Sequence, residues 1–248
     1  MKKGIVGALN AGLHRIGLDL QVSRFPVFES LGHYLQRLGI EVVLDVGANE
    51  GQFGEELRSN GFHGRIISFE PQSRVFATLQ AKAARDKNWE CHQFALGDTN
   101  GTSMLHLSKN SVFSSLLKLS DSAGEIGYDA GSDSEETITI KTLDTVWPTL
   151  GCDRRCTLLK IDTQGFDLAV LRGARQSHPH LQAVQLEVPL RSMYDGQPTV
   201  GEMLPVLRGM GFHLVELTKV CRASVTGELL EMDGLFVRTA KNVTPPGD

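Results

Sequence analysis

The sequence has few cysteines, few aromatic residues and no long apolar run. Four cysteines in 248 residues do not make a disulfide framework, which is typical of a reducing compartment, so we expect a cytoplasmic protein. Cys152 and Cys156 are spaced like half of a zinc site, but no second Cys or His pair accompanies them, so no metal site is predicted. No stretch approaches the roughly 20 apolar residues of a transmembrane helix, so no membrane span is expected.

The sequence also lacks an excess of basic charge. Its 25 Lys and Arg residues stand against 29 Asp and Glu residues, a formal net charge of -4. Without a general positive field to attract phosphates, we expect no nucleic-acid partner. With 41% hydrophobic and 22% charged residues, the composition is that of an ordinary globular protein that is long enough to bury a full core.

From position 41 onward, short β-branched runs alternate with longer helical patterns, as in parallel βαβ units. This order predicts an α/β fold with a doubly wound, mostly parallel sheet and an antiparallel hairpin at its edge. The predicted strands are 41–46, 65–69, 89–94, 102–107, 136–140, 157–161, 182–188, 212–217 and 235–238, and the predicted helices are 52–60, 73–85, 166–172 and 200–210.

The chain is expected to divide into three parts. Residues 1–40 form an N-terminal helical extension, residues 41–240 form one α/β domain, and residues 241–248 form a disordered tail. The start of the extension imitates a signal peptide, but Asn10, His14 and Arg15 interrupt its apolar stretch. We interpret it as a helix that packs on the domain or contacts a partner, and it is a candidate element for a homodimer.

The segment 42–51 (VVLDVGANEG) stands where the first predicted strand meets its helix. Glycine there lets the chain turn sharply and lets backbone approach a ligand without a Cβ. Asn49 occupies the middle position of the dinucleotide pattern Gly-x-Gly-x-x-Gly, and Gly51 comes too early for it. Asp45 would repel a pyrophosphate but attract the amino and sulfonium groups of S-adenosylmethionine. The segment therefore favours the methyl donor over NAD.

Glu70 ends the second predicted strand about 20 residues after the glycine turn, where an acidic side chain accepts hydrogen bonds from both ribose hydroxyls. Segment 95–98 (ALGD) follows the third strand and is placed to close over the adenine, with Asp98 as an acceptor for its amino group. An ordinary Gly-Asp turn is the alternative. The predicted cofactor-binding residues are Asp45, Gly47, Ala48, Asn49, Gly51, Glu70, Pro71, Leu96, Gly97, Asp98 and Asp162.

Together these residues resemble the FkbM family of S-adenosylmethionine-dependent methyltransferases. The resemblance covers about 42–238 and includes the segments 44–51 (LDVGANEG), 69–71 (FEP), 95–98 (ALGD), 114–116 (SSL), 142–144 (TLD), 159–167 (LKIDTQGFD) and 170–174 (VLRGA). It implies the Rossmann-like class I methyltransferase fold and methylation of a hydroxyl on a sugar, glycan or natural product. The family usually has Glu where this chain has Asp167.

Asp162 and Glu187 end neighbouring predicted strands. Methyl transfer to a hydroxyl requires in-line geometry and removal of a proton. Asp162 is the main candidate for that proton, although Asp before a helix is also a strong N-cap. With Glu187 it could orient a sugar diol, or hold a magnesium ion that lowers the pKa of the hydroxyl. The predicted substrate-binding residues are Ser114, Ser115, Gln164, Arg191 and Tyr194.

Two other functions remain compatible with the sequence. A nicotinamide-dependent oxidoreductase would share the fold, but the missing middle glycine disfavours it. A cofactor-binding scaffold without catalysis, acting in glycan assembly, would share both the fold and the cofactor site. Fold alone does not choose among the three.

Overall fold

The computed structural model describes residues 31–108, 111, 114–120, 134–223 and 226–238. Residues 1–30 of the predicted extension and the whole predicted tail, 241–248, lie outside the described residues. The helical expectation for the extension can therefore be examined only from residue 31 onward, where helix α2 occupies Leu31–Arg37.

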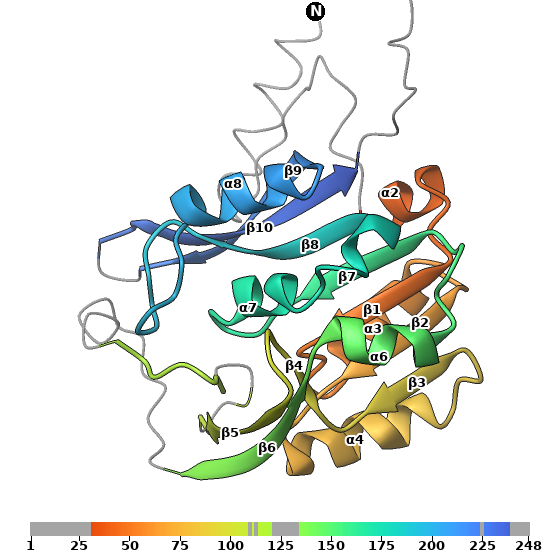
Figure 1. Ribbon diagram of the computed structural model, residues 1–248, viewed down its shortest axis with the longest axis horizontal. Coiled ribbons are helices and arrows are strands. Elements are labelled where there is room, and N and C mark those ends of the chain that lie inside the picture. The colour runs from red at the N-terminus through yellow and green to blue at the C-terminus, as the bar shows by residue number, and fades with distance from the viewer. Residues whose placement is uncertain (1–30, 109–110, 112–113, 121–133, 224–225, 239–248) are drawn as a thin grey trace, which may run out of the picture.

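The main sheet has seven strands in the order β3-β2-β1-β7-β8-β10-β9 (Figure 1). The first five are parallel, and β10 runs antiparallel between β8 and β9. This confirms the doubly wound, mostly parallel sheet with an antiparallel hairpin at its edge. The strand bounds are β1 Val42–Val46, β2 Arg65–Phe69, β3 Trp89–His92, β7 Thr157–Ile161, β8 Leu181–Pro189, β9 Phe212–Arg222 and β10 Leu229–Arg238.

A second sheet has three strands in the order β4-β6-β5. Its strands are β4 Ala95–Leu96, β5 Gly101–His106 and β6 Glu135–Lys141. The predicted strand 89–94 is therefore two strands in two sheets, because β3 ends at His92 and β4 begins at Ala95. In Figure 1 the small sheet lies at the opposite side of the molecule from β9 and β10.

Helices cover both faces of the main sheet because side chains alternate between the faces along each strand. Val42, Leu44 and Val46 of β1 pack toward helices α6, α7 and α8, whereas Val43 packs toward α2, α3 and α4. Within the described ranges, no helix combines the length and the apolar character that crossing a bilayer requires. The helix bounds are α3 Gln52–Ser59, α4 Ser73–Ala83, α6 Leu143–Leu150, α7 Asp167–Arg172 and α8 Val200–Gly209.

Helix α6 is an element that the sequence pattern did not predict. It contains Pro148 and three β-branched residues, Thr145, Val146 and Thr149, which disfavour a helix in isolation. Thr142 caps it by accepting a hydrogen bond from the Thr145 amide, and its apolar side chains, among them Trp147, pack on the sheet. Tertiary packing therefore outweighs weak helix propensity at this position.

The topology brings distant segments to one edge of the main sheet. The carboxyl ends of the parallel strands β1, β2, β7 and β8 meet there, as in other doubly wound sheets. Strand β10 runs the other way, so its first half reaches the same edge, with Asp233 opposite Glu187. This edge carries the candidate site.

Candidate functional site

The turn after β1 depends on backbone conformations that favour glycine. Gly47 has a φ of 73°, and a Cβ there would lie 1.8 Å from the carbonyl oxygen of Asp162. The amides of Gly47 and Ala48 both donate to the Phe69 carbonyl, at 3.0 and 3.1 Å. Gly51 has a φ of 87° and packs against α4 and Trp89, so it serves helix packing rather than a ligand. Glycine at position 47 therefore permits the close approach of the β1 turn to the end of β7.

Glu70 joins this turn to the end of β2. Its Oε2 accepts a hydrogen bond from the Asn49 amide at 2.9 Å, and its Oε1 accepts one from the Gln72 amide at 2.8 Å. Burial raises the pKa of Glu70 to about 7, although the two amides oppose that shift. The side chain thus organises the turn and also lines the adjacent cavity.

A cavity opens between this turn and the small sheet. Its apolar wall consists of side chains that include Phe69, Leu96, Leu105 and Leu116. The predicted site residues that line it are Gly47, Asn49, Glu70, Pro71, Leu96, Ser114, Ser115, Asp162 and Gln164.

The remaining predicted cofactor residues lie elsewhere. Gly97 packs tightly against Phe166 and the small sheet, and Asp98 is exposed. Ala48 lines a second, wider cavity on the α3 side of the sheet. Asp162, Gly47 and Asn49 line both cavities, so Asp162 stands where the two meet.

Asp45 is fully buried behind the turn, where it is paired with a cation of this chain. Lys160 Nζ lies 3.0 Å from Asp45 Oδ1 and 3.4 Å from Asp162 Oδ2, and it donates to the Gly47 carbonyl at 3.3 Å. Ser68 Oγ donates to Asp45 Oδ2 at 3.2 Å. Burial lowers the pKa of Lys160, but Asp45 and Asp162 outweigh it and hold that pKa above its ordinary value. Asp45 therefore supports the turn from behind and its charge is matched by Lys160.

Gln164 is hydrogen-bonded to several of the predicted site residues. Its Nε2 donates to Asp162 Oδ1 at 3.1 Å and to Glu187 Oε2 at 3.1 Å, while its Oε1 accepts from the Tyr194 hydroxyl at 2.8 Å. Its backbone carbonyl accepts from Ser115 Oγ at 2.7 Å. These partners determine which way the amide points. Gln164 also has a φ of 53°, an uncommon conformation for a residue with a side chain.

Residues 45–214 match the family model described as the methyltransferase FkbM domain. This chain belongs to the FkbM methyltransferase family. The match covers more than half of the chain, and it confirms the resemblance that the motifs indicated. A search of curated proteins finds no match.

Solved structures with a similar arrangement are distant in sequence. The methyltransferase domain of bacterial CtHen1 is 10% identical, with a TM-score of 0.46 over 85% of this chain and 96% of that one. Fibrillarin from Aeropyrum pernix, solved with S-adenosyl-L-methionine, is 12% identical, with a TM-score of 0.45 over 79% and 66%. TehB from Haemophilus influenzae is 8% identical, with a TM-score of 0.45 over 83% and 60%.

In this FkbM family member, further carboxyl groups surround Glu187, which is itself only 7% exposed. Glu231 of β10 is hydrogen-bonded to it. Burial raises the pKa of Asp167 and that of Glu231 to about 7, and that of Asp233 to about 6, with neighbouring carboxylates adding to each shift. The carboxyl groups at this edge of the sheet, beside Asp162, therefore bind protons more readily than ordinary carboxyl groups do.

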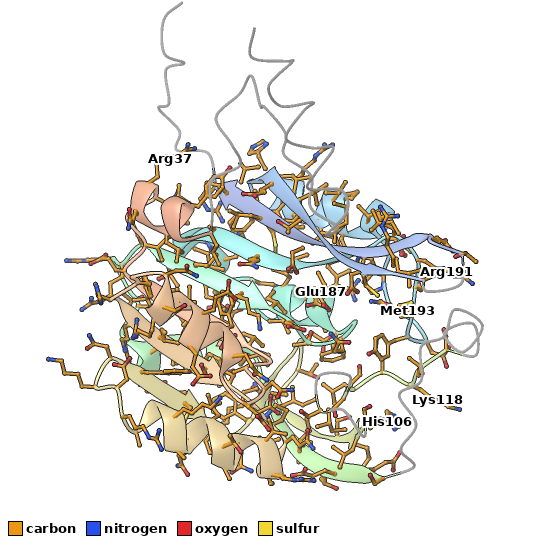
Figure 2. The ribbon with its side chains drawn as sticks, turned by 180° about the vertical axis from the view of Figure 1, so that it is seen from behind. Arg37, His106, Lys118, Glu187, Arg191 and Met193 are labelled. Atoms are coloured by element: carbon orange, nitrogen blue, oxygen red, sulfur yellow. The ribbon has the colours of Figure 1, made fainter. Side chains whose placement is uncertain are left out.

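Sequence reasoning missed Glu231 and Asp233, because nothing local shows that β10 enters the sheet beside β8. The available signal was weak: two acidic residues two positions apart interrupt an otherwise apolar strand. Arg191, by contrast, was predicted as a substrate residue. Its Nη1 lies 3.1 Å from Glu228 Oε2, and Figure 2 shows it well apart from Glu187.

The arrangement between Asp162 and Glu187 does not fit a magnesium ion. An amide N–H group, Gln164 Nε2, points at both carboxylates from the position that a bridging cation would need, and Mg²⁺ requires oxygen ligands. Within the part of the chain that the structure describes, no group of three or more His, Cys, Asp or Glu residues is arranged to hold a metal.

Proposed function

We propose that this protein transfers the methyl group of S-adenosylmethionine to a hydroxyl of a sugar, glycan or natural-product acceptor. One observation carries the proposal. One cavity is lined both by Glu70, which we assign to the ribose, and by Asp162, which we assign to the reacting hydroxyl. Membership of the FkbM family supports methyl transfer as the reaction, and the cavity offers a site where the methyl donor and the acceptor could bind next to each other.

The first cavity suits the methyl donor in two respects. Glu70 offers carboxylate oxygens to the ribose hydroxyls, and the apolar wall that includes Leu96 and Leu105 suits the adenine. The tight turn at Gly47 allows backbone to approach the methionyl part closely. The donor's sulfonium would then lie toward Asp162, which also lines this cavity.

Asp162 is the group that an acceptor can reach. Its side chain is 41% exposed, whereas Glu187 is only 7% exposed. As the acceptor oxygen attacks the methyl carbon, the C–S bond breaks and the hydroxyl proton passes to Asp162, leaving S-adenosylhomocysteine and a methyl ether. Gln164 holds the Asp162 carboxylate in place through its amide.

The decisive experiment combines binding with transfer. Calorimetry is expected to show binding of S-adenosylmethionine and none of NAD. With an isotopically labelled methyl donor and a host metabolite and glycan extract, the label is expected in a hydroxyl-bearing product, with or without EDTA.

A matched pair of variants separates the possible outcomes. D162N is expected to retain donor binding but to lose about 100-fold or more in transfer rate, since a general base contributes about that much. Q182A, remote from the site at the start of β8, serves as the control. Binding of NAD alone would contradict the proposal. Tight donor binding with no transfer to any extract would favour a scaffold instead.

A further inference from the structure

The antiparallel insertion of β10 places two acidic residues on the same face as Glu187. The register pairs Asp233 with Glu187 and Glu231 with Pro189, so Glu231 is the diagonal neighbour of Glu187. Diagonal neighbours in an antiparallel pair are within reach of long side chains. The Glu231 carboxyl uses that reach to form a hydrogen bond with the Glu187 carboxyl.

A hydrogen bond between two carboxyl groups requires a proton. An ionised carboxylate has only acceptor oxygens, so two ionised groups in contact repel each other rather than bond. Here burial raises the pKa of both glutamates, and Asp162 and Asp167 face them from β7 and α7 and raise it further. The pair therefore retains one shared proton near neutral pH.

Other charged groups near the pair do not remove the need for that proton. Asp233 adds a further negative charge next to Glu231 on β10. Lys160 acts on Glu187 from β7, but it is already paired with Asp45 and Asp162. Cys221, which lies opposite Glu231 on β9, carries no positive charge. The shared proton is what keeps the carboxyl group of buried Glu187 and that of half-buried Glu231 in contact beside Asp162.

We propose that Glu231 is a positioning residue for methyl transfer: as the diagonal neighbour of Glu187 across the β8–β10 pair, it holds the Glu187 carboxyl against Gln164 and so fixes Asp162 for the acceptor hydroxyl. The connection runs from Glu231 to Glu187, from Glu187 to Gln164 Nε2, and from that amide to Asp162 Oδ1. This inference rests on the proposed function. The shared proton is not consumed, because the acceptor proton goes to Asp162 and from there to solvent.

The inference predicts how the transfer rate depends on pH. As pH rises through the pKa of the pair, the shared proton is lost and two adjacent anions repel. Glu187 then no longer holds Gln164, so kcat is expected to fall on the alkaline side of neutrality. The KM for the methyl donor is expected to change little, since neither glutamate lines the first cavity.

Two variants at position 231 test this. In E231Q the amide donates to Glu187 as the protonated carboxyl did, so kcat at pH 7 is expected within about threefold of wild type and without the alkaline fall. In E231A that hydrogen bond is lost, so kcat is expected to fall about tenfold with KM for the donor unchanged. E228Q, an exposed glutamate in the turn before β10, is the control. An E231Q enzyme that keeps the wild-type alkaline fall, or that is as impaired as E231A, overturns the inference.

A second measurement does not depend on turnover. The infrared spectrum of E231Q at pH 7 is subtracted from that of the wild type, so that bands from Glu70 and Asp167, whose pKa is also about 7, cancel. The difference is expected to contain a protonated carboxyl band from the Glu187–Glu231 pair, and absence of that band from the difference overturns the inference even if the enzyme is active. A wild-type protein that shows the band but transfers no methyl group to any acceptor contradicts the proposed function and, with it, the positioning role, while leaving the shared proton itself established. If E231A fails to fold, the pH profile of E231Q decides.

Discussion

Two regions of the same sheet edge accommodate buried carboxyl groups in different ways. At β1, Asp45 is fully buried and its charge is matched by Lys160 and the Ser68 hydroxyl. At β8 and β10, Glu187 and Glu231 face each other, and a shared proton does what Lys160 does at β1. The Asp45 carboxylate is stabilised by a permanent cation, whereas the Glu187–Glu231 pair should respond to pH near neutrality.

The two regions also differ in how well they should tolerate substitutions. Around the β1 turn, backbone atoms are in near contact, and the left-handed conformations of Gly47 and Asn49 leave little room for change. Around Glu187, long side chains make the contacts, and a substitution of similar shape can be accommodated. Substitutions should therefore be most damaging at the turn and graded elsewhere.

The largest effect is expected from G47A. Its Cβ would lie 1.8 Å from the Asp162 carbonyl oxygen, so the turn and the end of β7 must separate. A displacement of this size should weaken binding of the methyl donor by about 100-fold, by analogy with other misplaced site groups. Calorimetry and thermal melting measure this. The control is G61A, with a φ of 82° but nothing within 4 Å, which should bind normally. Equal binding by the two variants would contradict the steric argument.

K160M should cause the next largest effect, because it leaves Asp45 buried without its cation. Breaking a buried pair from one side costs about 3–5 kcal/mol in free energy of unfolding. Its control is K82M, since Lys82 pairs with Glu55 on the surface and such pairs contribute at most about 1 kcal/mol. Urea denaturation compares the two. If K160M is no less stable than K82M, Asp45 does not depend on Lys160.

E70Q should weaken binding of the methyl donor by about tenfold, because a charged acceptor for the ribose is lost. Burial raises the pKa of Glu70 to about 7, so in the wild type the carboxylate is increasingly protonated as pH falls below that value. Affinity of the wild type should therefore decrease from pH 8 to pH 6, while that of E70Q should not. Calorimetry at three pH values measures this, and a wild-type affinity independent of pH would argue against a ribose contact.

A smaller effect concerns stability. The pKa of Glu231 is about 7 in the folded protein against an ordinary value of 4.5, so the folded state binds the proton more tightly. Stability from this group is present below pH 4.5 and is lost as pH rises toward 7. E231Q cannot lose a proton, so its melting temperature should exceed that of the wild type by a few degrees at pH 8 and match it at pH 4.5. A gap that does not grow with pH would contradict the shared proton.

The smallest effect is expected from R191A. Arg191 pairs with Glu228 at 3.1 Å, at a partly exposed position away from both cavities. Loss of such a pair should change stability by less than about 1 kcal/mol, and donor binding should stay unchanged. Thermal melting and calorimetry measure this. A large loss of transfer rate would show that the acceptor extends to this loop.

Much of the first region could be predicted from local sequence. The glycine turn, the acidic residue after β2 and the aspartate after β7 each follow a strand, and parallel strands place their carboxyl ends at one edge. Asn49, Glu70 and Asp162 accordingly line the same cavity. Local sequence could not show that Asp45 is paired with Lys160, because the partner of a buried acid depends on the neighbouring strand.

The contacts of the second region, around Glu187 and Glu231, could not be predicted from local sequence because they arise from strand pairing. The pairing of β10 with β8 brings Glu231 next to Glu187 from 44 positions away in the chain, and no local pattern encodes that register. The same is true of the small sheet, which takes Leu96 and Leu105 out of the main sheet to wall the cavity.

The sequence by itself determined the alternation of most strands and helices along the chain, the turn that only glycine permits, and the family. These follow from short-range chemistry, in which each residue acts through its own backbone conformation or its nearest neighbours. Tertiary structure alone decided which carboxyl groups are matched by a cation and which share a proton. That outcome depends on burial and on the charges that packing brings within a few ångströms, and neither is a property of any single segment.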